Sequence, residues 1–335
     1  MLTRRSFAAF LALGLNALAV ADPSSAPNRR AAGPLAVGTA RFDWQDASRS
    51  RAVPAKVYFP KDGPGPFPLV IFSHGLGGTR EGYEYVGRHW ASHGYVSVHL
   101  QHLGSDDAVW RGQGLNGLKA MSQAAADPAN ALNRPLDVRF AIDQMLRLNA
   151  EPGEFHGKLD TNRIGMAGHS FGAYTTLAVA GEIFGAGERS LGDPRVKAAI
   201  AMSSPVPRGD RDRALGQIKI PMLHLTGTAD NSPIGGTKPE DRRVPFDKIH
   251  GADQFLVTFT GGDHMIFSGV NGLRRNHQKD ALFHDLIRAS TTAFWDAYLK
   301  DNAKAKVWLT NGGFEKELGP EGVFEKKLKP GTAGP

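Results

Sequence analysis

The chain has 335 residues, of which 41% are hydrophobic and 22% charged, and its formal net charge is +7. This is the composition of an ordinary globular protein, long enough for one large domain. The absence of cysteine excludes disulfides, thiolate zinc sites and a cysteine nucleophile. Lysine and arginine are spread along the chain, so we expect no nucleic-acid partner, which would require a basic cluster.

Residues 1–21 have the features of an export signal. Arg4 and Arg5 precede an apolar run, Phe7–Val20, that is shorter than the roughly 20 residues needed to span a bilayer. The run ends in Ala19-Val20-Ala21, a small-x-small pattern that suits signal peptidase. Residues 3–7 also match the twin-arginine pattern, which implies export after folding.

Removal of this leader would leave a net charge of 7 − 2 = +5, because the leader contains two arginines and no acidic residue. We therefore expect a periplasmic or secreted protein with no stable membrane anchor after signal removal. Residues 22–34, rich in Pro, Ser and Ala, are expected to form a flexible linker. Residues 35–335 are expected to form a single domain.

Short apolar runs then alternate with longer helical patterns. The expected strands are Ala55–Phe59, Leu69–Phe72, Tyr95–Leu100, Arg163–Ala167, Val196–Met202, Met222–Thr226 and Phe255–Phe259. The expected helices are Glu84–His93, Arg134–Leu148, Ala173–Gly181 and Leu282–Leu299. This alternation predicts an α/β protein with a mostly parallel central sheet and helices on both faces.

The sequence allows alternative placements for two segments. Residues 102–133, rich in Gly, Ala, Asp and Asn, form either an insertion over the site or a plain surface connection. The tail Val307–Leu328 carries three aromatic residues that would pack either on the domain or on a neighbouring molecule. The sequence does not indicate an oligomeric state.

The segment Gly168-His169-Ser170-Phe171-Gly172 is a G-x-S-x-G motif between an expected strand and an expected helix. A nucleophilic serine in such a sharp strand-to-helix turn projects its oxygen above the sheet, and the flanking glycines relieve the crowding. The motif therefore predicts Ser170 as a nucleophile. His169 is expected to be a structural residue rather than the base.

A second glycine-rich segment follows the strand at Leu69. His74-Gly75-Leu76-Gly77-Gly78 is typical of the loops that supply a backbone donor to an oxyanion hole. We expect the backbone N–H groups of Leu76 and Phe171 to bind the oxyanion. His74 is expected to stabilise the loop.

A nucleophilic serine needs a base, and the base needs an orienting carboxylate. The order Ser, then Asp or Glu, then His is typical when the serine lies in such a turn. Asp230 follows the strand that begins at Met222, and His264 follows the strand that begins at Phe255. These positions predict Asp230 as the acid and His264 as the base.

Other carboxylates, other histidines and a metal site suit this chemistry less well. Asp263 adjoins His264 but neighbours in sequence rarely face each other, and His224 lies inside a strand. The 12 histidines include no H-E-x-x-H motif. We therefore expect no catalytic metal and no cofactor.

With these residues placed, the chain resembles the platelet-activating-factor acetylhydrolase-like branch of the α/β hydrolases. The resemblance is carried by SHGLGGTREGYEYVGRHWASHGYVSVHLQH and by GHSFGAYTT, and it extends over roughly Pro68 to Leu299. It also includes the dienelactone-hydrolase-like and cutinase-like enzymes. The resemblance implies an α/β-hydrolase fold with Ser170 and His264 catalytic and the Leu76 and Phe171 N–H groups in the oxyanion hole.

The chain departs from these relatives at two points. Typical dienelactone hydrolases use a cysteine nucleophile, which is missing here. The animal acetylhydrolases carry the acid after the strand that follows the nucleophile helix, where this chain has Ser203-Ser204. Asp230 instead matches the later position used by cutinase-like enzymes.

The sequence therefore predicts an exported serine hydrolase that cleaves carboxylic esters through an acyl-enzyme intermediate. One alternative keeps these residues but acts as a depolymerase or amidase on an extracellular polyester, polyamide or peptide. A second alternative is a non-catalytic binding protein on the same scaffold, which would be expected to lack one of the three residues.

Overall fold

A computed structural model describes residues 28–185, 189–232, 234–269 and 278–329. The predicted leader, residues 1–21, and the first part of the predicted linker lie outside the described residues. Arg29 is buried and forms an ion pair with Asp296 at 3.0 Å. The chain therefore contacts the rest of the domain before the predicted boundary at residue 35.

The core of the molecule is a nine-stranded sheet with the order β1-β2-β4-β3-β5-β8-β9-β10-β11. The five pairs from β4 through β10 are parallel, and the pairs at the two ends of the sheet are antiparallel. The strands are β1 (Val37–Asp46), β2 (Arg51–Pro60), β3 (Phe67–Ser73), β4 (Val96–Leu100), β5 (Leu159–His169), β8 (Val196–Met202), β9 (Met222–Ala229), β10 (Gln254–Asp263) and β11 (Gly322–Lys327). A separate small ribbon pairs β6 (Ile183–Phe184) with β7 (Arg189–Ser190).

Helices cover both faces of the sheet. The described helices are α1 (Glu84–Ser92), α2 (Gly117–Ala126), α3 (Pro128–Ala150), α4 (Phe171–Ala180), α5 (Arg211–Leu215), α6 (Val244–Lys248), α7 (Asp280–Leu299), α8 (Ala303–Thr310) and α9 (Gly313–Leu318). Helices α3, α4 and α5 contribute to one hydrophobic core, and α1, α7, α8 and α9 contribute to the other. The predicted α/β-hydrolase fold, a mostly parallel sheet with helices on both faces, is confirmed.

Strand β3 is covered by helices on both faces of the sheet. All its residues are buried, and its side chains alternate between the two faces. Leu69 and Ile71 lie in the core beneath α3 and α4, whereas Val70 and Phe72 lie in the core beneath α1 and α7. A continuous apolar run is the expected pattern for a parallel strand buried on both sides.

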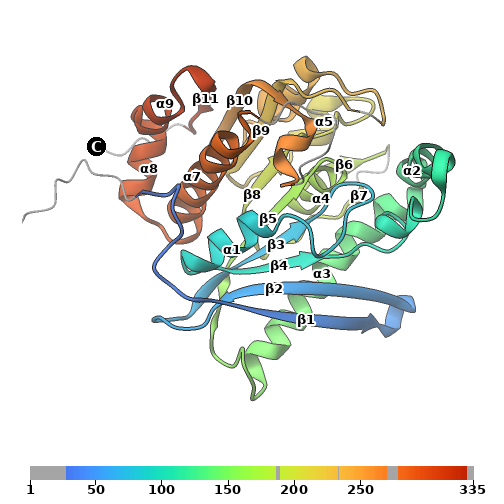
Figure 1. The fold of residues 1–335 in the computed structure, drawn as a ribbon, viewed down its shortest axis with the longest axis horizontal. Coiled ribbons are helices and arrows are strands. Elements are labelled where there is room, and N and C mark those ends of the chain that lie inside the picture. The colour runs from blue at the N-terminus through green and yellow to red at the C-terminus, as the bar shows by residue number, and fades with distance from the viewer. Residues whose placement is uncertain (1–27, 186–188, 233, 270–277, 330–335) are drawn as a thin grey trace, which may run out of the picture.

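The edge strands β1 and β11 were not predicted, whereas their neighbours β2 and β10 contain the expected strands Ala55–Phe59 and Phe255–Phe259. In Figure 1 the β1–β2 hairpin closes one end, and β10 with β11 closes the other. The tail packs on its own domain, because Phe324 of β11 stacks on Phe255 with the ring centres 5.8 Å apart and Phe314 is buried. Within the described residues no helix is long and apolar enough to cross a membrane.

Residues 102–133 contain one complete helix and the start of another. Helix α2 projects from the body of the molecule in Figure 1. Helix α3 begins at Pro128, before the predicted start at Arg134, because Asp127 caps it by accepting a hydrogen bond from Ala129 N–H. Proline is tolerated in the first helical turn, where its missing N–H would have no partner.

Candidate active site

Ser170 lies between the last residue of β5 and the first residue of α4. Its backbone has φ 56° and ψ −114°, a region that residues other than glycine rarely adopt. A Cβ atom on Gly172 would lie 1.9 Å from the carbonyl oxygen of Ser73, and one on Gly168 would lie 2.2 Å from that of Gly172. The two glycines of the motif are therefore required by close backbone contacts around the turn.

The structure brings Ser170, Asp230 and His264 together in one hydrogen-bonded chain, here called the Ser170 series. His264 Nε2 lies 2.9 Å from Ser170 Oγ, and His264 Nδ1 lies 2.8 Å from Asp230 Oδ1. Asp230 follows β9, and His264 begins a short 3₁₀ turn directly after β10. Parallel strands end at the same edge of the sheet, so residues distant in sequence meet there.

Asp230 is fully buried, and its carboxylate receives several further contacts. Thr226 Oγ1 donates to Asp230 Oδ2 at 2.9 Å, and Ser203 Oγ donates to the same oxygen. Ser203 directly follows β8 and has a positive φ of 54°. The residue directly after β8 therefore supplies a hydroxyl that binds the carboxylate of the residue directly after β9.

Arg242 is a neighbour of this series that the sequence analysis missed. Its guanidinium is buried, and Nη2 lies 3.4 Å from Asp230 Oδ1 and 3.4 Å from His264 Nδ1. Its Nη1 donates to the carbonyl oxygens of Ser203 and Ser204. Burial lowers the pKa of Arg242, although the Asp230 carboxylate opposes this change. No local motif marks Arg242, so only the folded arrangement identifies it.

The two expected oxyanion donors lie on segments that adjoin Ser170, because Phe171 follows it in the chain and a Cβ atom on Gly75 would lie 3.4 Å from Ser170 Cβ. Leu76 is in the turn after β3, and Phe171 is the first residue of α4. Neither backbone N–H donates a hydrogen bond to another group within the described residues. Free N–H groups at a helix N-terminus and in a glycine-rich turn suit an incoming anion.

A second set of hydrogen bonds connects this turn to the His264 loop. Gly75 N–H donates to Tyr83 Oη at 3.1 Å, and Tyr83 Oη lies 2.8 Å from His169 Nδ1. His169 Nε2 lies 2.9 Å from the carbonyl oxygen of His264. These partners assign the proton of His169 to Nε2, so that Tyr83 donates to Nδ1. Burial lowers the pKa of His169, and a neutral imidazole fits both contacts.

A further serine, histidine and aspartate are connected below the Leu76 turn and are called the Ser73 series. His102 Nε2 lies 2.9 Å from Ser73 Oγ, and His102 Nδ1 lies 3.0 Å from Asp137 Oδ2. All three side chains are fully buried. Arg49 and Arg51 form ion pairs with Asp137 at 2.8 and 2.9 Å. The sequence analysis did not identify this series, because its members are far apart in the chain.

The segment 102–133 contacts the same turn. Trp110 Nε1 donates to the carbonyl oxygen of Gly77 at 2.8 Å, and a Cβ atom on Gly77 would lie 2.8 Å from the indole ring and 3.1 Å from Met121. Gly77 also has a positive φ of 74°. The indole therefore packs directly on the glycine-rich turn.

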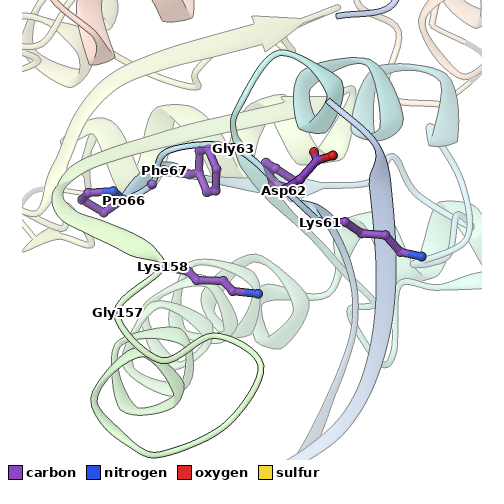
Figure 2. Close-up of a pocket in the computed structure, with 9 residues that line it drawn as sticks. Lys61, Asp62, Gly63, Pro66, Phe67, Gly157 and Lys158 are labelled. Carbon is purple, nitrogen blue, oxygen red and sulfur yellow. The ribbon is translucent and has the colours of Figure 1, made fainter. Parts of the chain in front are cut away.

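One pocket lies away from both series. Figure 2 shows it between Lys61, Phe67 and Lys158, with Pro66 and Gly157 at its margin. Phe67 begins β3 and Lys158 precedes β5, so the pocket lies at the edge where these parallel strands start. Ser170 follows the opposite end of β5, and the pocket is therefore not part of the candidate active site. The described residues contain no cluster of metal-ligating side chains.

Comparisons with known proteins bear on this arrangement. A family model for platelet-activating factor acetylhydrolase, isoform II, matches residues 30–111, which include the Leu76 turn but not Ser170. The platelet-activating factor acetylhydrolase of Cavia porcellus is 27% identical over 312 residues, covering 84% of this chain and 69% of that protein. The chain is similar to the platelet-activating factor acetylhydrolases.

Two further acetylhydrolases show the same similarity over a shorter stretch. Those of Canis lupus familiaris and Bos taurus are each 27% identical over 229 residues. Each alignment covers 60% of this chain and 48% of the mammalian protein. The matched part is therefore about half the length of either relative. The comparisons confirm the predicted resemblance to the acetylhydrolase-like α/β hydrolases and support an ester-hydrolysing enzyme.

Proposed function

We propose that this protein is an exported serine hydrolase that cleaves carboxylic esters, with Ser170 as nucleophile, His264 as base and Asp230 as the orienting acid. The observation that carries the proposal is the Ser170 series itself, whose two hydrogen bonds measure 2.9 and 2.8 Å. Ser170 also lies in a strained turn beside two unpaired backbone N–H groups. This combination suits acyl transfer.

In the first half of the reaction, His264 Nε2 accepts the Ser170 hydroxyl proton as Oγ attacks the ester carbonyl carbon. Asp230 accepts a hydrogen bond from His264 Nδ1 and stabilises the imidazolium that forms. The carbonyl oxygen becomes an oxyanion and accepts hydrogen bonds from the N–H groups of Leu76 and Phe171. The C–O bond to the alcohol then breaks, and His264 returns the proton to the departing alcohol.

The second half repeats these steps with water. His264 takes a proton from water, the hydroxide attacks the acyl-enzyme, and the bond to Ser170 Oγ breaks as the serine is protonated again. Each backbone donor to the oxyanion is typically worth a factor of about 10²–10³ in rate. The reaction needs no cofactor.

The names of the relatives suggest where to begin with substrates. They are acetylhydrolases, so a short acetyl ester is the first substrate class to test. We extend the proposal to esters in general rather than to one phospholipid.

The test is hydrolysis of p-nitrophenyl esters from acetyl to palmitoyl by the purified mature protein, with Ser170→Ala as the control. Strong activity on short acyl chains that disappears in the variant would support the proposal. Full activity in Ser170→Ala would overturn it. Labelling of the wild-type serine by a fluorophosphonate probe provides a readout that does not depend on the choice of ester.

A polymer substrate is the second candidate, and the exposed apolar side chains of the 102–133 segment favour it. Trp110, Leu115 and Leu118 are exposed, and Trp110 contacts the turn that carries a proposed oxyanion donor. Negligible turnover of every small ester, in a protein whose Ser170 still reacts with the fluorophosphonate, would favour a polyester or polyamide.

Export is proposed from residues 1–21, whose twin arginines and small-x-small ending are typical of a cleaved leader. Expression of the full chain in a bacterium followed by fractionation and N-terminal sequencing tests it. We expect periplasmic or secreted protein that begins at Asp22. Protein that keeps its first residues and stays in the cytoplasm would contradict export.

A further inference from the structure

Arg134, in the first half of α3, is a fully buried arginine with no acidic partner within the described residues. Its Nε donates to Ser105 Oγ at 2.9 Å, and its Nη1 donates to the carbonyl oxygen of His74 at 2.8 Å. Its Nη2 lies 3.2 Å from His74 Nδ1. The nearby carboxylate of Asp137 is instead bound by other arginines and by a histidine.

A buried cation without a carboxylate is costly, because neutral acceptors replace water only in part. The other arginines buried to a similar degree in the described chain have acidic partners: Arg29 pairs with Asp296, and Arg242 lies 3.4 Å from Asp230. Burial lowers the pKa of Arg134 to about 9, which reflects the same cost. A buried charge that forms no ion pair and lies next to a proposed reaction site is a candidate for a functional role.

Arg134 contacts both segments that supply the proposed oxyanion donors. The His74 carbonyl that accepts its hydrogen bond lies in the peptide group directly before the one that carries the Leu76 N–H. On the other side, its guanidinium carbon lies 4.4 Å from the centre of the Phe171 ring. One rigid group therefore bridges the glycine-rich turn and the first residue of α4.

We propose that Arg134 is the positioning residue of the oxyanion hole. It holds the Leu76 and Phe171 N–H groups at a fixed separation, and it places behind them a positive charge that forms no ion pair with a carboxylate in the described residues. The field of a buried charge is screened far less than that of an exposed one. The guanidinium charge can therefore stabilise an oxyanion held between these two segments. This inference rests on the proposed function of Ser170.

The alternative is that Arg134 only anchors α3 to the sheet. A purely structural arginine would affect folding and the amount of active protein, but not the relative affinity for a charged intermediate and a neutral substrate. The test must therefore compare these two affinities in the same variant.

The experiment measures kcat, KM and the inhibition constant of an aryl trifluoromethyl ketone, whose adduct with Ser170 carries an anionic oxygen. In Arg134→Gln we expect kcat to fall about ten- to hundredfold, somewhat less than for loss of a direct donor. We expect KM to stay within about threefold and the inhibition constant to rise in parallel with the fall in kcat/KM. Arg134→Lys should recover part of both effects.

Arg29→Gln is the matched control, because Arg29 is equally buried but pairs with Asp296 away from the site. It should leave kcat and the inhibition constant unchanged. An Arg134→Gln enzyme that folds and binds the ketone as tightly as the wild type would overturn the proposal. So would a parallel loss of kcat and inhibitor affinity in Arg29→Gln.

If Arg134→Gln does not fold, Arg134→Lys and Ser105→Ala decide the question. Ser105→Ala removes one acceptor of Arg134 and should weaken ketone binding by about two- to fivefold. Unchanged ketone affinity in both variants would overturn the proposal. Failure of wild-type Ser170 to react with a fluorophosphonate would instead mean that the proposed function is wrong.

Discussion

The Ser170 series and the Ser73 series contain the same three residue types in the same order of hydrogen bonds. In the first, Asp230, His264 and Ser170 are connected at 2.8 and 2.9 Å; in the second, Asp137, His102 and Ser73 are connected at 3.0 and 2.9 Å. Distances between the side chains therefore do not distinguish them.

The surroundings of the two series do distinguish them. Ser73 is the last residue of β3 and is fully buried, whereas Ser170 lies half-buried in a strained turn after β5. The Ser170 oxygen has unpaired N–H groups nearby, and Asp137 is held by two arginines. A catalytic role requires access for substrate and donors for the oxyanion in addition to the three residues. We interpret the Ser73 series as structural support for the turn above it.

The largest expected contrast is between the two serines. Ser170→Ala should lower kcat/KM by about 10⁴-fold or more, because it removes the nucleophile. Ser73→Ala should retain at least about a tenth of the wild-type value. Steady-state hydrolysis of p-nitrophenyl acetate by both purified variants measures the difference. A Ser73→Ala enzyme as inactive as Ser170→Ala, yet folded by circular dichroism, would remove the distinction drawn here.

The acid of the Ser170 series should give the next largest effect. Asp230→Asn should lower kcat by about 10³–10⁴-fold, since an amide neither stabilises the imidazolium nor favours the required tautomer. The hydroxyls of Ser203 and Thr226 would retain an oxygen acceptor, but the buried Arg242 would lose its acidic partner, so the melting temperature should also fall. Kinetics and thermal denaturation of this variant are the measurements. A loss of less than tenfold in kcat would argue that another carboxylate serves as the acid.

Replacement of Asp137 in the Ser73 series should lower stability without a large loss of kcat. Asp137→Asn should lower the free energy of unfolding by about 2–4 kcal/mol, because Arg49 and Arg51 lose a charged partner but still reach solvent in part. The folded fraction should keep kcat within about tenfold of the wild type. Urea denaturation and active-site titration with the fluorophosphonate separate the two quantities. Unchanged stability with greatly reduced kcat would assign this carboxylate to the chemistry instead.

The smallest effect concerns pH. Burial lowers the pKa of His102 to about 4, whereas in the unfolded chain its pKa returns to about 6.5. Between these values the unfolded state holds more protons, so the free energy of unfolding falls as the pH drops through this window. The slope from one histidine is at most about 1.4 kcal/mol per pH unit. His89, His99 and His224 have lowered pKa values for the same reason and add to it.

Urea denaturation at several pH values between 7 and 5 measures this slope. His102→Gln should reduce the slope by up to one proton, whatever it does to stability at pH 7. An unchanged slope in this variant would contradict a neutral, buried His102. The interpretation of the Ser73 series as a buried structural support would then lose the evidence that its histidine is uncharged.

Much of the fold followed from local sequence patterns. The expected strand Val196–Met202 agrees with β8 at both ends, and the G-x-S-x-G segment spans the junction of β5 and α4, with Ser170 between them. These features depend on hydrophobic periodicity and turn chemistry within a few residues. The edge strands β1 and β11 were missed, because strands at the ends of a sheet have exposed positions that interrupt the apolar pattern.

The sequence by itself predicted Ser170 as the nucleophile, and chain order together with the strand positions predicted Asp230 as the acid and His264 as the base. Only the tertiary structure decided what surrounds them. It brings Arg242 to the acid, Ser203 to the same carboxylate, and Arg134 to the two proposed oxyanion segments. These contacts join residues that are remote in the chain, and no local periodicity records which surfaces meet. The difference in burial between Ser170 and Ser73 then separates the proposed catalytic series from the structural one.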